Sequence, residues 1–383
     1  MKYISAKMTL TWLIMACCPL LVVANELDCD RLAETNVDGL RILQHIWVKS
    51  GSQVSVSIPN STMPLEGHCM LQGEIEARPS ELPTVDSRYA IKFELRLPDH
   101  WQHRFLYEGG GGLDGVAKEA VGHVRTLDNG QAYEPALNKG FVVVTSDSGH
   151  TESQNPGFGQ DPLARQNYAQ ASIGKVTSVA KRLTQSYYGQ RPRYSYFMGC
   201  SKGGQEALQA MHRFGTEYDG IVAGAPALHL PHAAIAQIHD VQVLASISPI
   251  AKNGKPDLSQ AFSASDLDLV AQGVAQQCSS GEDKQVIKPE QCQFNPEVLQ
   301  CSGEKNAQCL LKTQVHALKQ IFGGTYASSG QKIYPAFPYD TGISSPGWRT
   351  WKLGDGQRPS LNEILGGGSL AQVFMTPPVA GID

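Results

Sequence analysis

The sequence predicts an α/β protein in which helices pack against a mostly parallel sheet. Phe141–Thr145 is a continuous apolar and β-branched run, as expected of a strand buried on both faces. Short strands at 194–198 and 221–223 alternate with stretches of helical spacing at 169–188 and 205–214. Strands that alternate with helices favour parallel pairing, because each helix carries the chain back across the sheet.

The chain before these elements is predicted to be rich in strands, from residue 25 to about residue 105. Residues 52–58 and 90–97 alternate polar and apolar side chains, and Pro98 ends the second run. Phe105–Tyr107 is a third short strand, and it leads directly into the glycine run Gly109–Gly112. We therefore expect the sheet to begin with these strands.

The pattern changes in the second half of the chain. Residues 229–247 and 266–277 have helical spacing, and four cysteines fall within 278–309. Strands no longer alternate with helices there. We therefore expect two parts, an α/β core at 25–227 and a disulfide-bonded lid or cap insertion at 228–383.

The first 24 residues predict a signal peptide, and with it a secreted or periplasmic location. Two lysines precede the uncharged, mostly apolar run 8–23, and Val22-Val23-Ala24 offers a cleavage site. An uncleaved membrane anchor is less favoured, because the run is short and Pro19 interrupts it. Lipoprotein processing at Cys17 is also less favoured, because the apolar run continues past that cysteine.

The charge of the chain excludes partners that need a basic surface. The formal net charge is −4 and the pI is about 6.3. A protein of this charge has no basic field to hold nucleic acid or an anionic membrane. We expect a small-molecule partner, no nucleic acid and no membrane after signal cleavage, and the oligomeric state stays open.

The cysteines predict disulfides in an oxidising compartment. Of the 9 cysteines, Cys17 and Cys18 leave with the signal peptide, so the remaining number is odd and at least one thiol has no partner within the chain. Their spacing fits no zinc site, and we expect no metal. The remaining cysteines are Cys29, Cys69, Cys200, Cys278, Cys292, Cys301 and Cys309.

The pentapeptide Gly199-Cys200-Ser201-Lys202-Gly203 fits the pattern G-x-S-x-G. The pattern alone is common, but here a predicted strand precedes it and a predicted helix follows, which is the context of a nucleophile elbow. Glycines at both ends let the strand and the helix approach each other without a Cβ clash. Ser201 is therefore the candidate nucleophile, and the alternative is an ordinary serine in a tight turn.

The run Gly109–Gly112 follows another predicted strand. In α/β hydrolases such a loop supplies the second backbone N–H of an oxyanion hole, and the residue after the serine supplies the first. Those residues are here Lys202 and Gly112, or Gly111 in place of Gly112. A flexible surface turn is the alternative, and a phosphate-binding loop is less favoured because neither GxGxxG nor a GK[ST] motif follows.

A serine nucleophile needs a base and an orienting acid, which in this fold come later in the chain than the serine. None of the downstream histidines follows a strand of the sheet, so we expect each to be an ordinary histidine and the triad to be incomplete in this chain. These histidines are His212, His229, His232, His239 and His316.

The elbow has a cysteine directly before the serine, and two consecutive glycines, Gly203 and Gly204, shortly after it. Together with several further stretches of the chain, this elbow forms a recognisable sequence pattern. The further stretches are residues 69–73, 89–94, 104–115, 145–150, 213–214, 218–226, 347–351 and 375–378. On these residues the chain resembles the tannase/feruloyl esterase family, which also includes mono(hydroxyethyl) terephthalate hydrolases, from about Cys29 to the last residue.

The resemblance implies an α/β-hydrolase core with a cap and a secreted serine ester hydrolase for phenolic or aromatic esters. It also implies that Cys200 pairs with a cysteine just after the catalytic histidine. The chain ends at Asp383 without the Asp segment or that His-Cys segment. We therefore expect a truncated reading, with the C-terminal part of the core missing and Cys200 unpaired. The other pairs implied are Cys29–Cys69, Cys278–Cys292 and Cys301–Cys309.

Two departures from the family pattern narrow these expectations. Residues 278–284 lack the spaced aspartates of the family's calcium loop, so we expect no cofactor there. Residues 360–368 lack an arginine that could hold a terephthalate carboxylate, so a phenolic ester is the broader expectation. An inactive relic or binding module is the alternative from another class. A lipase is less favoured, because this cap is polar and rich in cysteine.

Overall fold

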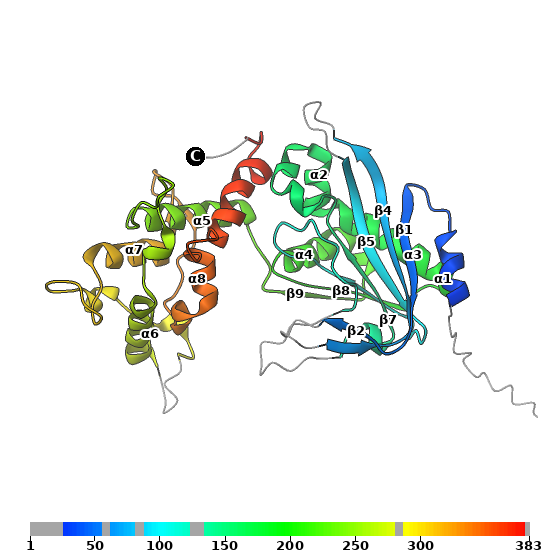
Figure 1. Ribbon diagram of the computed structural model, residues 1–383, viewed down its shortest axis with the longest axis horizontal. Coiled ribbons are helices and arrows are strands. Elements are labelled where there is room, and N and C mark those ends of the chain that lie inside the picture. Colours follow the sequence, from blue (N-terminus) through cyan, green and yellow to red (C-terminus); the bar gives the residue numbers. More distant parts are fainter. Residues whose placement is uncertain (1–25, 56–61, 81–87, 123–133, 280–285, 380–383) are drawn as a thin grey trace, which may run out of the picture.

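The protein is described by a computed structural model that covers residues 26–55, 62–80, 88–122, 134–279 and 286–379. It has two lobes (Figure 1), one built on a large sheet and one built of helices. The predicted signal peptide lies outside the described residues. No helix in the described part of the chain is both long and apolar enough to cross a membrane.

The sheet lobe contains a seven-stranded sheet in the order β1-β4-β5-β7-β6-β8-β9. A separate hairpin is formed by β2 and β3, and β10 and β11 pair in the helical lobe. The strands are β1 (Leu40–Val48), β2 (Ser52–Ser55), β3 (Thr62–Leu65), β4 (His68–Pro79), β5 (Arg88–Pro98), β6 (Arg104–Glu108), β7 (Phe141–Ser146), β8 (Tyr194–Cys200), β9 (Gly220–Gly224), β10 (Thr325–Tyr326) and β11 (Lys332–Tyr334).

The sheet is mixed, which corrects the expectation of a mostly parallel one. β7, β6, β8 and β9 pair in parallel, whereas β1, β4, β5 and β7 pair antiparallel. The N-terminal strands follow one another without a crossover helix between them, and antiparallel pairing needs none. The parallel half therefore begins at β6, and this half carries the elbow.

Helices of the sheet lobe cover one face of the sheet. Val176, Ala180 and Leu183 of α3 pack with Phe105 and Phe197 in the main core. Alternate residues of a strand point to opposite faces of the sheet. Leu106 of β6 and Val143 of β7 accordingly belong to a second cluster on the other face. β7 is thus buried on both faces, as the sequence predicted. The helices of this lobe are α1 (Glu26–Ala33), α2 (Pro162–Gln166), α3 (Ser172–Tyr188) and α4 (Lys202–Phe214).

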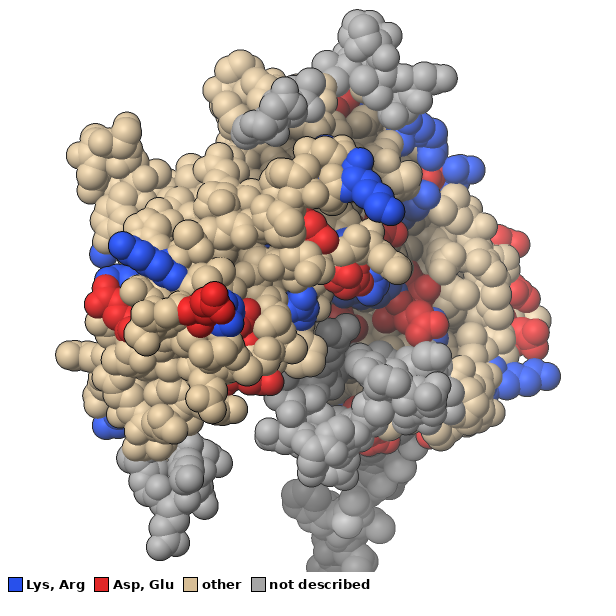
Figure 2. All heavy atoms as spheres, turned by 60° about the vertical axis from the view of Figure 1, so that its left-hand side comes forward, with Lys and Arg blue, Asp and Glu red and all other residues tan. Residues whose placement is uncertain are grey.

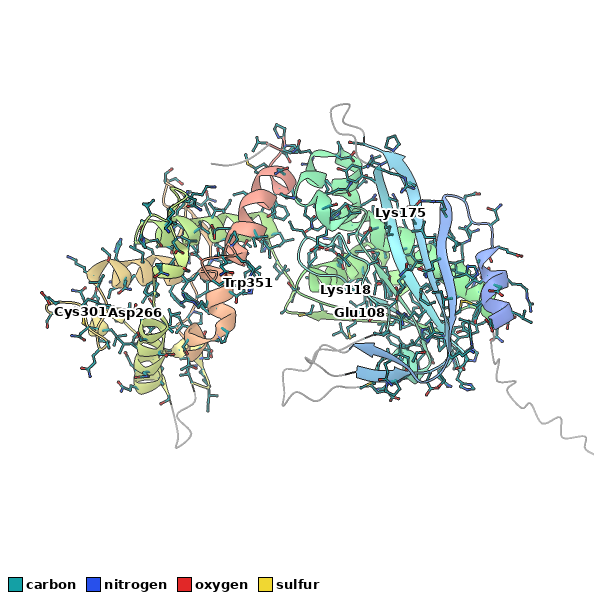
Figure 3. All side chains as sticks on the ribbon, viewed as in Figure 1. Glu108, Lys118, Lys175, Asp266, Cys301 and Trp351 are labelled. Carbon is teal, nitrogen blue, oxygen red and sulfur yellow. A yellow bond between two sulfur atoms is a disulfide. The ribbon has the colours of Figure 1, made fainter. Side chains whose placement is uncertain are left out.

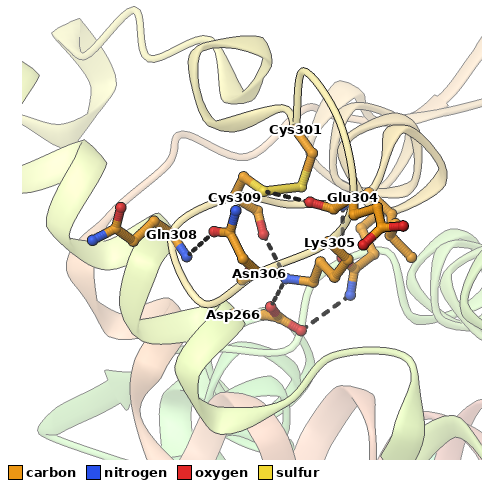
Figure 4. Close-up of a disulfide and its surroundings, with 9 residues drawn as sticks. Asp266, Cys301, Glu304, Lys305, Asn306, Gln308 and Cys309 are labelled. Atoms are coloured by element: carbon orange, nitrogen blue, oxygen red, sulfur yellow. Dashed lines mark hydrogen bonds and ion pairs between the residues drawn. A yellow bond between two sulfur atoms is a disulfide. The ribbon is translucent and has the colours of Figure 1, made fainter.

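The helical lobe has a hydrophobic core of its own, centred on Phe262, Val274 and Leu318. Its loops are tied by Cys278–Cys292 and Cys301–Cys309. The second disulfide closes a loop in which Lys305 donates to Asp266 of α6 and to the backbone of Cys309 (Figure 4). The helices of this lobe are α5 (Leu230–Ala245), α6 (Ala264–Cys278), α7 (Lys312–Gly323) and α8 (Pro346–Lys352).

The last described helix, η11 (Leu370–Phe374), returns to the sheet lobe beside α2 (Figure 1). The Gln160 side-chain amide donates to Gln372 at 2.8 Å, and Arg165 donates to the carbonyl of Met375 at 3.2 Å. The helical lobe is therefore joined to the sheet lobe at both of its ends. Positive and negative side chains are interspersed over the face shown in Figure 2.

The third disulfide, Cys29–Cys69, joins α1 to β4, so the structure contains the three pairs that the resemblance implies. Cys200 is free and exposed. We expect thiol titration of a denatured, unreduced chain that begins at Asn25 to find one thiol. The Cys200→Ser variant should titrate to none, and a thiol that persists in this variant would mean that one of the three disulfides does not form.

Candidate active site

The candidate nucleophile lies on a sharp turn between β8 and α4. Ser201 has φ 61° and ψ −117°, a conformation that side-chain-bearing residues rarely adopt. Its N–H donates to the carbonyl of Gly224 at 3.1 Å, and its carbonyl accepts from the N–H of Ala227 at 3.1 Å. The end of β9 and the segment that follows it therefore hold this strained residue from both sides, and Ser201 itself is exposed.

Three glycines of the elbow have no room for a side chain. A Cβ at Gly199 would lie 2.3 Å from the carbonyl oxygen of Gly203. One at Gly203 would lie 2.9 Å from the carbonyl oxygen of Gly110, and one at Gly204 would lie 2.4 Å from that of Gly224. The strand, the helix and the glycine loop therefore meet backbone to backbone.

The run Gly109–Gly112 lies against the start of α4. The N–H of Gly109 donates to the carbonyl of Met198 in β8 at 2.8 Å, and the N–H of Gly110 donates to Glu206 Oε2 at 2.9 Å. Neither Gly111 nor Gly112 uses its N–H in a hydrogen bond to another described residue. These two donors and the N–H of Lys202, which begins α4, are thus available to a ligand. Their binding of an oxyanion stays a prediction.

The rest of this loop is fixed through its backbone amides. The N–H of Gly115 donates to the carbonyl of Asp147. The N–H groups of Ala120 and Gly122 donate at 3.0 Å to the carboxylates of Glu94 and Glu108. Glu108 and Lys118 of this segment lie on the side of the sheet lobe that faces the helical lobe (Figure 3).

The side chain of Lys202 is buried beneath the elbow, a feature that sequence analysis missed because it considered only the backbone N–H. Its Nζ donates to Glu206 Oε1 at 2.9 Å and to the carbonyl of Tyr168 at 3.2 Å, and it lies 4.4 Å from the centre of the Tyr168 ring. Burial alone would lower the pKa of Lys202, but the carboxyl groups of Asp114 and Glu206 outweigh it and raise that pKa.

Asp114 and Glu206 are both buried next to this ammonium group. Ser148 Oγ lies 3.0 Å from Asp114 Oδ2 and 3.0 Å from Glu206 Oε1, so one hydroxyl bridges the two side chains. Burial and the neighbouring Glu206 raise the pKa of Asp114 well above its usual range. Burial also acts to raise the pKa of Glu206, but Lys202 and the N–H of Gly110 outweigh it and lower that pKa.

His150 supports the glycine loop from below. Its Nε2 lies 2.9 Å from the carbonyl oxygen of Leu113, and its ring stacks on Phe158 with the centres 3.7 Å apart. Burial lowers the pKa of His150 to about 4. The neutral ring therefore donates from Nε2 to the loop, and Nδ1 has no hydrogen-bond partner. Both segments appear among the stretches that carried the resemblance, but their contact could not be read from them.

None of the histidines that follow Ser201 within the described residues is hydrogen-bonded to its hydroxyl. His212 lies on the exposed side of α4. His229 has φ 49° directly before α5, and its ring lies 6.2 Å from that of His232. These two follow Ala227, whose N–H contacts the elbow, but both are exposed. The described residues thus contain a strained strand–turn–helix at Ser201 and free loop donors, but no histidine bonded to the serine hydroxyl.

The described residues contain no group of three or more His, Cys, Asp or Glu side chains that could hold a metal ion. Most of the segment considered for calcium, residues 278–284, lies outside the described part of the chain, which leaves out residues 280–285.

The mixed sheet, the strand–turn–helix at Ser201 and the cap together are the fold of an α/β hydrolase. The family described as "Tannase and feruloyl esterase" matches residues 78–376. The chain belongs to this family.

Curated relatives agree with this assignment. The chain is 32% identical to a mono(2-hydroxyethyl) terephthalate hydrolase of Piscinibacter sakaiensis, over 93% of this chain and 64% of that protein. It is 27% identical to feruloyl esterase C of Talaromyces stipitatus, over 80% of this chain and 55% of that protein. The chain thus spans between half and two thirds of the length of these relatives.

Solved structures agree in fold. Feruloyl esterase B from Aspergillus oryzae aligns with a TM-score of 0.68 at 24% identity, over 87% of this chain and 62% of that one. A tannin acyl hydrolase from Aspergillus niger aligns with a TM-score of 0.62 at 18% identity, over 94% of this chain and 65% of that one.

The elbow glycines give a direct test of the close backbone approach. We expect Gly199→Ala to lower the free energy of unfolding by about 2 kcal/mol or more, because the new methyl group meets rigid backbone. Gly215→Ala is the matched control, since nothing lies within 4 Å of its Cβ position. Urea denaturation measures both, and equal losses would contradict the packing described.

His150 predicts a pH dependence of stability. Its pKa is lower in the folded protein, about 4, than the ordinary 6.5, so the unfolded chain binds the proton more tightly. Its contribution is therefore complete above pH 6.5 and lost as the pH falls toward 4, by up to about 3 kcal/mol. The difference in unfolding free energy between wild type and His150→Phe should shrink over this range.

Val121→Ala, at a buried position of the same loop region, is the control for this pH series, because it removes no titratable group. Asp147 acts in the opposite direction, since burial raises its pKa to about 7. Asp147 is present in wild type and in both variants, so its contribution to the unfolding free energy cancels when each variant is compared with wild type. A His150→Phe difference that does not change between pH 7 and pH 4 would contradict the buried, neutral histidine.

Proposed function

We propose that this chain carries the nucleophile and oxyanion hole of a secreted serine ester hydrolase for phenolic or aromatic esters. Ser201 is the nucleophile. The N–H of Lys202 and that of Gly112, or Gly111, bind the oxyanion. The observation that carries the proposal is the strained Ser201 at the start of α4, beside loop amides that have no other described partner.

The arrangement suits acyl transfer to a serine. Ser201 Oγ adds to the ester carbonyl while a base takes its proton, and the carbonyl oxygen becomes an oxyanion at the N-terminus of α4. Collapse of this intermediate releases the alcohol with a proton and leaves an acyl-serine. Water then attacks the acyl group, and the free acid departs. Each donor directed at the oxyanion is worth about 2.7–4 kcal/mol in such sites.

The choice of substrate rests on the relatives. Their names specify feruloyl esters and mono(2-hydroxyethyl) terephthalate, in which the acyl group is aromatic or carries an aromatic ring. The chain spans only part of those proteins, so their activity comes to it as a proposal. The three disulfides favour an oxidising compartment and hence secretion.

A second candidate is a non-catalytic relic or a binding module. It is favoured by one observation, which is that no described histidine is hydrogen-bonded to Ser201. Such a protein would bind an aromatic ester in the same place without hydrolysing it.

We expect the purified chain to hydrolyse methyl ferulate slowly, because a serine hydroxyl without a positioned base loses several orders of magnitude in rate. Added imidazole should accelerate the reaction, since it can supply the base that the described site lacks. Product release followed by chromatography measures both rates, and methyl gallate serves as a second substrate.

Ser201→Ala is the control, and it should abolish the acceleration by imidazole. An equal imidazole effect in wild type and variant would contradict the nucleophile role of Ser201. Robust hydrolysis without imidazole that disappears in Ser201→Ala would show that a complete triad exists, and the expected lack of a base would then be wrong. Binding of methyl ferulate without any hydrolysis would favour the second candidate.

A further inference from the structure

A buried pair of carboxyl groups lies between the glycine loop and α4, and the reaction outlined above makes no use of it. We propose that Asp114 and Glu206 share one proton, carried by Asp114, and that this acid–carboxylate pair positions the Gly109–Gly112 loop over the start of α4. Both would be positioning residues, because they act through the backbone of the loop.

The two contacts of Ser148 favour the extra proton. Ser148 Oγ lies at hydrogen-bond distance from both carboxyl groups, at 3.0 Å from Asp114 Oδ2 and 3.0 Å from Glu206 Oε1. A serine hydroxyl has one hydrogen and can donate to one of these oxygens only. Both contacts are full two-centre hydrogen bonds when the other carboxyl group is protonated and donates to Ser148 Oγ, whereas two carboxylates would have to share the single hydrogen.

The remaining partners place the proton on Asp114. Glu206 accepts from Lys202 Nζ at 2.9 Å and from the N–H of Gly110 at 2.9 Å, as a carboxylate does. Asp114 Oδ1 has no hydrogen-bond partner, and it lies 3.7 Å from Lys202 Nζ. One ammonium group then balances one carboxylate, whereas two buried carboxylates would leave a net negative charge at high cost.

The directions of the pKa shifts agree with this assignment. Burial and Glu206 raise the pKa of Asp114, while Lys202 and Gly110 hold that of Glu206 below its ordinary value against the effect of burial. The buried hydroxyls of Tyr107 and Tyr168 face the same group, and burial raises the pKa of each, so both stay neutral.

The pair holds the loop from two sides. Glu206 accepts the N–H of Gly110, and Asp114 lies directly over the same residue, since a Cβ at Gly110 would be 2.1 Å from Asp114 Oδ2. The N–H of Asp114 in turn donates to the carbonyl of Gly111 at 2.9 Å. The shared proton thus joins the loop to Ser148, in the turn after β7, and to α4. Any effect of this pair on catalysis rests on the proposed oxyanion role of the loop. The existence of the shared proton does not rest on that role.

Infrared spectroscopy of the folded 383-residue chain tests the proton without any need for activity. We expect the carbonyl-stretch band of a protonated carboxyl group to persist at pH about 9, where Asp147 with its pKa of about 7 is ionised. The band should disappear in Asp114→Asn. It should also disappear in Glu206→Gln, because the single remaining carboxyl group then ionises beside Lys202. Either variant suffices if the other fails to fold.

The matched control is Asp266→Asn, which removes a buried aspartate that is paired with Lys305 and is ionised. This variant should keep the band. A wild-type spectrum without the band at pH about 9, or a band that survives in both Asp114→Asn and Glu206→Gln, would overturn the shared proton.

Hydrogen exchange of the segment 109–110, whose two amides are hydrogen-bonded, tests the positioning. Asn is the neutral counterpart of a protonated Asp and can donate to Ser148, so exchange in Asp114→Asn should stay within about twofold of wild type. Asp114→Ala and Ser148→Ala should accelerate exchange of this segment by about tenfold, with helix α6 unchanged as the internal reference. Equal exchange in Asp114→Ala and wild type would overturn the positioning role, whatever the outcome of the ester assay.

Discussion

Helix α4 begins in backbone contact with β8 and with the Gly109–Gly112 loop, and the rest of the site depends on that contact. No side chain separates Gly199 from Gly203, or Gly203 from Gly110. The helix N-terminus and the free amides of the loop therefore lie beside the same exposed serine. This geometry forces Ser201 into a backbone conformation with positive φ, and such strain persists only where the surrounding structure enforces it. The hydrogen bonds of Ser201 to Gly224 at the end of β9 and to Ala227 beyond it do so.

A charged group under the elbow is an unexpected way to support it. Lys202 directs its ammonium group into the protein, where Glu206 and Tyr168 bind it. Buried ion pairs add little net stability, because desolvation offsets their attraction. They do, however, penalise any other arrangement of the same groups. In the proposal above, the Lys202–Glu206 pair helps to define the position of the loop more than it stabilises the fold.

The helical lobe is an independent structure joined to the sheet lobe at two places. It has its own hydrophobic core and two disulfides, and its chain leaves the sheet after β9 and returns through η11. β9 is the last strand on its side of the described sheet, and its Val222 is 59% exposed. Within the described residues, the edge of the sheet at β9 is thus uncovered at Val222.

The sequence by itself located the strands β5 to β9 and the turn between β8 and α4, because periodicity and glycine placement are local properties of the chain. The apolar run in β7 predicted a strand that is buried on both faces of the sheet. Sequence motifs also located Ser201 and the Gly109–Gly112 loop. The disulfide pairs came from the resemblance, since parity alone left their partners open. The start of α4 was expected three residues later, at Gln205, because glycine is a poor helix former. Backbone contact with β8 and the loop overrides that preference.

Only the tertiary structure decided the direction of the N-terminal strands and the chemistry beneath the site. Alternation of side chains predicts a strand but not its partner, so the antiparallel half of the sheet could not be foreseen. A lysine in a sequence indicates a solvent-exposed charge. Lys202 is buried because Asp114, 88 residues earlier, and Glu206, one helical turn later, reach the same point in space. Such a meeting of distant charges is a property of the folded chain, because no local pattern records it.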